Sequence, residues 1–103
     1  MQEKVKVFNE NRNAHLKPMP TYARLLDIQS EMGELAKEYL KATKYGTENF
    51  NLTKDFELEF GDVLYSLLSL SNDLNFSAEN SLDLVLKKYQ ERLTKNNNMG
   101  SSN

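Results

Sequence analysis

The chain has no cysteine, only one histidine and no long hydrophobic run among its 103 residues. Without cysteine it can form neither a disulfide framework nor a thiolate metal site, which is compatible with a reducing compartment. No stretch approaches the roughly 18 apolar residues of a membrane span, and the charged start Met1-Gln2-Glu3-Lys4 lacks the apolar core of a signal peptide. We therefore expect a cytoplasmic protein without a membrane partner.

The charge balance argues against a nucleic-acid-binding protein. Thirteen basic and fifteen acidic residues give a net charge of -2, which argues against a general nucleic-acid surface and against a nucleic-acid polymer as partner. Hydrophobic residues make up 39% of the chain and charged residues 27%, as in globular proteins. At this length we expect one small domain over residues 1–95, followed by a disordered polar tail over residues 96–103.

Apolar residues recur at helical spacing in four segments, so the expected fold class is all-α. Threonine or serine stands at the predicted N-cap of the last three segments, and Tyr45-Gly46 is the stop signal after the second. The four segments begin near Gln2, Thr21, Thr53 and Ser77 and end near Arg12, Lys44, Ser71 and Lys95.

The third segment is unusual because Val63 to Leu70 is apolar or serine throughout. A helix without a polar stripe has to be covered on most sides, and three other helices offer little to cover it with. We therefore expect burial at a subunit interface, in a homodimer or homotetramer.

Two acidic pairs carry the main chemical signal. Residues three apart on a helix emerge on nearly the same face, about 5–6 Å apart. One such pair is ordinarily solvated surface. In both pairs, however, glycine precedes the second acid at a cost of about 1 kcal/mol relative to alanine, which suggests that the helices approach closely there. The pairs are Glu31-Met32-Gly33-Glu34 and Glu59-Phe60-Gly61-Asp62, and the first belongs to a carboxylate line Asp27, Glu31, Glu34 and Glu38.

Four converging carboxylates require a cation, because two like charges about 5 Å apart repel by roughly 3 kcal/mol at an effective dielectric constant near 20. A site with only carboxylate oxygens favours Mg²⁺, with Mn²⁺ as a substitute, over zinc. Lys88 and Arg92 lie near the end of the fourth segment, where cations cap a helix or contact phosphates. The lone His15 has no partner at ligand spacing, and Ser66 has no base partner that would make it a nucleophile.

Taken together, the stretches from Asp27 to Glu38, Tyr45-Gly46, and Glu57 to Leu64 resemble the MazG-like nucleotide pyrophosphohydrolases of the all-α NTP pyrophosphatase superfamily. The resemblance covers roughly residues 22–95. It implies a four-helix subunit that assembles into a helical-bundle dimer or dimer of dimers. It also implies acidic pairs that hold Mg²⁺ and hydrolysis of a nucleoside triphosphate to the monophosphate and pyrophosphate.

The resemblance also assigns roles to residues. The positions that match the metal-binding acids of the family are Glu31, Glu34, Glu59 and Asp62, and Glu38 is a further candidate for ligand or base. Many members carry another glutamate where this chain has Ser30, which leaves the number of metals open. Lys88 and Arg92 match the family's phosphate-contacting cations on the fourth helix.

The mechanistic hypothesis is that one of Glu31, Glu34 or Glu38 deprotonates water, which attacks the α-phosphorus while pyrophosphate leaves. The expected role is housecleaning of the nucleotide pool; the preferred base and sugar stay open. The alternative is a non-catalytic helical dimerisation module, which accounts for the apolar third segment but not for the matched acidic pairs. A phosphomonoesterase would need a nucleophile or a histidine cluster that the chain lacks.

Overall fold

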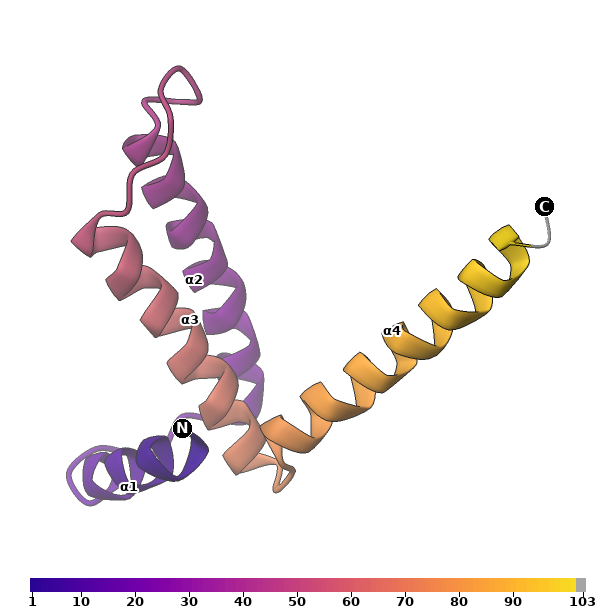
Figure 1. Ribbon diagram of the computed structural model, residues 1–103. Helices are drawn as coiled ribbons and strands as arrows, with labels where there is room; N and C mark the ends of the chain where they lie inside the picture. The colour runs from indigo at the N-terminus through magenta and orange to yellow at the C-terminus, as the bar shows by residue number, and fades with distance from the viewer. Residues whose placement is uncertain (102–103) are drawn as a thin grey trace.

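The computed structural model describes the backbone of residues 1–101 and the side chains of residues 1–96. It contains four helices, α1 (Gln2–Asn13), α2 (Thr21–Ala42), α3 (Lys54–Asp73) and α4 (Ala78–Ser101), and over this range there is no strand (Figure 1). The predicted all-α class with four helices is therefore confirmed. In the described part of the chain no helix is both long and apolar enough to cross a membrane.

Two of the three predicted N-caps are confirmed. The Thr53 hydroxyl accepts a hydrogen bond from the backbone N–H of Phe56 at 3.1 Å, and the Ser77 hydroxyl accepts one from the N–H of Asn80 at 3.1 Å. The predicted cap at Thr21 is wrong, because Pro20 already has the extended backbone of an N-cap and Thr21 is the first helical residue.

The connection between α2 and α3 turns sharply at the predicted stop. Lys44, Tyr45 and Gly46 have φ values of 47°, 59° and 84°, in the left-handed region that ends a helix. The Tyr45 N–H donates to the carbonyl of Leu40 at 2.7 Å, and the Gly46 N–H donates to the hydroxyl of Thr43 at 3.1 Å. The turn satisfies these backbone groups and sends the chain back antiparallel to α2.

The body of the molecule is the antiparallel hairpin of α2 and α3, which lie side by side, with α1 crossing α3 at its far end and α4 projecting away (Figure 1). Val63 and Leu68 of α3 are buried, and the rings of Phe8 and Tyr65 meet edge to face at 5.9 Å between α1 and α3. Yet Leu67 keeps 46% of its surface exposed. Within one chain, α1 and α2 thus cover most of the apolar segment of α3 and leave Leu67 exposed.

The two glycines of the acidic pairs do not mark a close approach of helices within this chain. A methyl group added at Gly33 or Gly61 would meet no atom of the described residues within 4 Å. That part of the sequence prediction is wrong inside the subunit, because neither glycine faces an atom of another helix at contact distance.

At the C-terminus, α4 extends to Ser101, past the domain boundary predicted at residue 95. No proline or other strong helix breaker stands between Leu93 and Met99 to stop it. Residues 102 and 103 of the predicted tail lie outside the described residues.

Candidate metal centre

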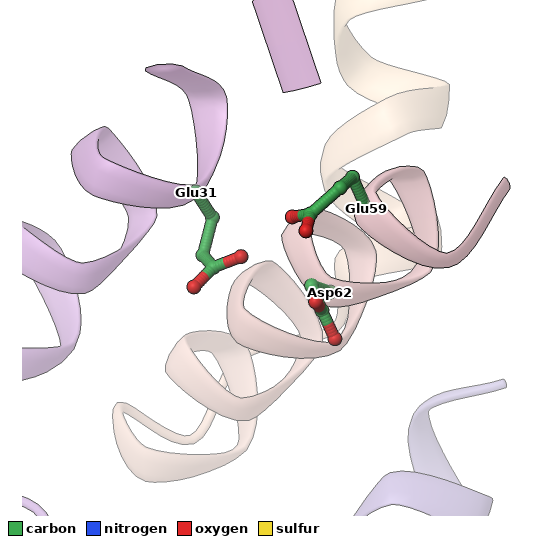
Figure 2. Close-up of side chains that lie close together, drawn as sticks. All are labelled: Glu31, Glu59 and Asp62. Atoms are coloured by element: carbon green, nitrogen blue, oxygen red, sulfur yellow. The ribbon is translucent and has the colours of Figure 1, made fainter. Parts of the chain in front are cut away.

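Three of the four predicted metal-binding acids converge across the hairpin. Glu31 of α2 faces Glu59 and Asp62 of α3 (Figure 2), and each offers one carboxylate oxygen such that these oxygens all lie within 4.8 Å of one another. Glu31 and Glu59 are half-buried, whereas Asp62 is exposed. The cluster therefore lies in the seam, the interface between α2 and α3, with one side open to solvent.

The register of the two helices brings these acids together. Glu59 and Asp62 are three residues apart on α3, so both project from the face that α2 covers. Glu34, the fourth predicted acid, is exposed and lies 4.0 Å from the Lys37 ammonium, outside the group of three. The ligand role of Glu34 stays a prediction.

Glu38 is engaged by a cation. Its carboxylate accepts a hydrogen bond from Lys41 Nζ at 3.2 Å, and its side chain is only 15% exposed. The hydrogen bond and the charge of Glu38 raise the pKa of Lys41. The predicted catalytic role of Glu38 would thus have to operate beside an ammonium group.

The electrostatics of the cluster fit a bound cation. Burial raises the pKa of Glu31 above 4.5, and the negative charges of Asp62, Asp27 and Glu59 raise it further. Oε2 of Glu59 is buried without a hydrogen-bond partner among the described residues. A divalent cation would satisfy this orphaned oxygen and remove the repulsion among the carboxylates, and hard carboxylate oxygens are ligands that Mg²⁺ and Mn²⁺ prefer.

Lys88 and Arg92, the predicted phosphate contacts, are not brought to the acids within one chain. Both are exposed on α4, which stands apart from the α2–α3 hairpin (Figure 1). Their role stays a prediction that depends on a second chain.

Sequence analysis missed two polar contacts along the same seam. The Ser66 hydroxyl of α3 donates to Oδ2 of Asp27 on α2 at 3.1 Å. Arg24 is buried, with Nε 3.8 Å from Asp73 Oδ2 and the guanidinium 5.7 Å from the centre of the Tyr65 ring. The spacing of Asp27 on the carboxylate line was a signal for the first contact; nothing in the sequence pairs Arg24 with Asp73.

The chain is similar to known proteins over most of its length. A relative from Bacillus subtilis (strain 168), YpjD, is 36% identical over 85 residues, which cover 79% of this chain and 71% of that protein. The crystal structure of a Bacillus-conserved MazG protein, described as a nucleotide pyrophosphohydrolase, matches with a TM-score of 0.69 and 28% identity over 86% of this chain and 84% of that one. The crystal structure of YPJD from Bacillus subtilis matches with a TM-score of 0.65 and 33% identity over 85% and 86% of the two chains.

The model of the MazG nucleotide pyrophosphohydrolase domain matches residues 21–96. This range includes both acidic pairs and the whole α2–α3 hairpin. The chain therefore belongs to the MazG family of nucleotide pyrophosphohydrolases, whose all-α four-helix fold it has.

Proposed function

We propose that this protein hydrolyses nucleoside or deoxynucleoside triphosphates to the monophosphate and pyrophosphate in a Mg²⁺-dependent reaction, as a housecleaning enzyme of the nucleotide pool. The observation that carries the proposal is the convergence of Glu31, Glu59 and Asp62 within 4.8 Å in a chain of the MazG family. Mn²⁺ is expected to replace Mg²⁺ because both take carboxylate oxygens.

In this proposal Glu31, Glu59 and Asp62 hold the cation, which neutralises the triphosphate and polarises its phosphoryl oxygens when bound. One carboxylate of α2 accepts a proton from water, whose oxygen forms a bond to the α-phosphorus. The bond from that phosphorus to the bridging oxygen breaks, and pyrophosphate leaves with the electron pair. Glu31, Glu34 and Glu38 are the candidates for the base.

The proposal includes assembly into a dimer or a dimer of dimers. Two features support it: α4 projects from the hairpin, and the apolar segment of α3 is only partly covered. In such an assembly Lys88 and Arg92 would reach the triphosphate of a neighbouring subunit, where their charges stabilise the phosphates.

The test is hydrolysis of a panel of canonical and modified triphosphates with Mg²⁺ in ¹⁸O-labelled water. We expect monophosphate and pyrophosphate, with the label in the monophosphate because water attacks the α-phosphorus. Label in the pyrophosphate would show that water attacks the β-phosphorus instead. Release of orthophosphate with a diphosphate product would reject the proposed reaction.

Variants connect the activity to the cluster. Glu59→Gln and Asp62→Asn are expected to lower kcat/KM by about a hundredfold or more, since each removes a ligand of the cation. Glu57→Gln is the matched control, because Glu57 is an exposed acid of the same helix. The alternative of a non-catalytic interaction module predicts no turnover of any triphosphate by the unsubstituted protein.

A further inference from the structure

The hydrogen bond between Ser66 of α3 and Asp27 of α2 has no assigned role in the proposed reaction. The Ser66 hydroxyl is on a residue that is only 2% exposed, and it donates to Oδ2 of the half-buried Asp27 at 3.1 Å. A buried serine in a helix ordinarily returns its hydroxyl to a carbonyl of its own helix, as Ser71 does to Leu68 at 2.7 Å. Ser66 instead bridges α3 to α2.

The position of this bridge relates it to the acidic cluster. Asp27 comes four residues before Glu31 on α2, and Ser66 comes four residues after Asp62 on α3. The helices are antiparallel, so both four-residue separations run in the same direction along the hairpin. The hydrogen bond therefore lies about one turn, or about 6 Å along the helix axes, from the acidic cluster. The bridge thus lies on the same faces as the cluster, in the next layer of the seam.

The hydrogen bond from Ser66 holds the Asp27 carboxylate near the cluster. A serine hydroxyl has a single hydrogen to donate, and a hydrogen bond to an ionised acceptor is stronger than one between neutral groups. Ser66 therefore holds the Asp27 carboxylate in place between α2 and α3. Asp27 lies one helical turn from Glu31 on the same face of α2, close enough for its charge to act on a cation in the cluster through space.

We infer that Asp27 is a positioning residue for the cation site: Ser66 holds its carboxylate one turn from Glu31, where its negative charge strengthens cation binding without direct ligation. The inference rests on the proposed cation site at Glu31, Glu59 and Asp62. It accounts for an acid that lies in the seam but outside the group of three.

The test measures cation binding directly in the full chain, with Mn²⁺ followed by electron paramagnetic resonance and Mg²⁺ by calorimetry. Asp27→Asn keeps the shape and an acceptor for Ser66 but removes the charge, so we expect about tenfold weaker binding of both cations. Ser66→Ala keeps the charge but releases the carboxylate, and about threefold weaker binding is expected. Glu10→Gln, which removes one exposed charge from α1, should leave the affinity unchanged.

Thermal unfolding of the metal-free variants separates this role from a merely structural one. If Asp27 acts through its charge, Asp27→Asn relieves repulsion, so the metal-free variant unfolds at the same or a higher temperature while its cation affinity falls. A variant that loses stability and affinity together would assign Asp27 a structural role and overturn the inference.

The same titrations keep the two proposals apart. Suppose that the Mn²⁺ affinity of Asp27→Asn is within twofold of that of the unsubstituted protein, while that of Glu59→Gln is far weaker. This result would overturn the role of Asp27 and leave the cation site standing. An unsubstituted protein that binds neither cation would overturn both.

Discussion

Glu31 is the acid most affected by its neighbours, because it meets Glu59 and Asp62 across the seam and lies one turn from Asp27 on its own helix. Burial and these charges raise its pKa above the value of 4.5 expected in the unfolded chain. The folded state therefore holds the Glu31 proton more tightly than the unfolded state does. Glu31 contributes stability at acidic pH, and that stability is lost as the pH rises through its raised pKa.

The prediction is that Glu31→Gln raises the melting temperature of the metal-free protein at pH 7 by a small amount, because solvent screens a half-exposed group. The difference should vanish below about pH 4, where the carboxyl is protonated in both states. Adding Mg²⁺ should reverse the order, since the unsubstituted protein, with all three carboxylates, gains more binding energy than the variant. Calorimetric scans over pH check this, and a metal-free variant less stable than its parent at pH 7 would contradict it.

Arg24 is a cation that is buried between α2 and α3. It is 5% exposed, and its Nε is buried without a hydrogen-bond partner in the described part of the chain; Asp73 lies 3.8 Å away. Burying a cation costs free energy that one distant carboxylate offsets only in part. The long apolar stem of arginine still contributes packing.

Two substitutions test this balance in opposite directions. Arg24→Met keeps the stem and removes the charge, so we expect the free energy of unfolding to be unchanged or higher by about 1 kcal/mol. Asp73→Asn leaves the buried cation without its partner and should lower it by about 1 kcal/mol, a modest loss because Asp73 is 36% exposed. Urea unfolding measures both, and a large loss in Arg24→Met would show that the charge itself stabilises the fold.

At the scale of the helices, the α2–α3 hairpin depends on the turn that follows Ala42. Gly46 has φ +84°, and an added methyl group would meet nothing within 4 Å among the described residues, so any cost there comes from the backbone alone. Gly33 also has free space around it, but it lies inside α2. The same substitution should therefore have opposite effects at the two glycines.

We expect Gly46→Ala to destabilise the protein by about 1 kcal/mol, because L-residues disfavour positive φ. Gly33→Ala should stabilise it by up to about 1 kcal/mol, because alanine is the better helix former. Chemical denaturation of both variants at one protein concentration makes the comparison. A loss of stability in Gly33→Ala would show that another chain packs against that face of α2.

The helices were predictable where local signals set them. The caps at Thr53 and Ser77 and the stop at Tyr45-Gly46 follow from side-chain chemistry and backbone preference within a few residues. The cap at Thr21 was misassigned because the residue before it, Pro20, already supplies the extended backbone.

The site was predictable only in part. Helical spacing shows which acids share a face of a helix, but it does not show which part of that face points toward the neighbouring helix. Glu31, Glu59 and Asp62 converge as expected, whereas Glu34 lies outside the group of three. Spacing alone could not separate these positions, since the difference depends on the rotation of α2 about its axis. The bridge from Ser66 to Asp27 likewise depends on the register between two helices distant in sequence.

The whole molecule is more open than a compact monomer of its size. Its accessible surface is 8189 Å², about 2,200 Å² more than the ~5,900 Å² expected for a monomer of 11.9 kDa. Its radius of gyration is 18.4 Å, where about 13 Å is typical of a compact domain of this length. Two such chains together exceed the expected surface by about 4,400 Å², which falls within the ~2,000–5,000 Å² that obligate interfaces bury over both partners.

Part of the exposed apolar surface forms one continuous stripe along α4. The residues of the stripe follow helical spacing of four, three and four, and each is about half exposed: Leu82, Leu86, Tyr89 and Leu93. Leu84 is 70% exposed but lies off this stripe, among polar residues of the same helix. In the proposed assembly, the stripe, rather than α4 as a whole, is the surface expected to contact a neighbouring chain.

Light scattering should accordingly give a mass of two or four chains. Leu86→Glu puts a charge in the middle of the stripe, where its burial is costly, and should shift the mass toward that of one chain. Leu84→Glu introduces the same charge off the stripe and should leave the assembly intact. Because α4 carries Lys88 and Arg92, dissociated Leu86→Glu should also lose triphosphate hydrolysis, whereas full activity in a monomeric variant would show that one chain contains the complete active site.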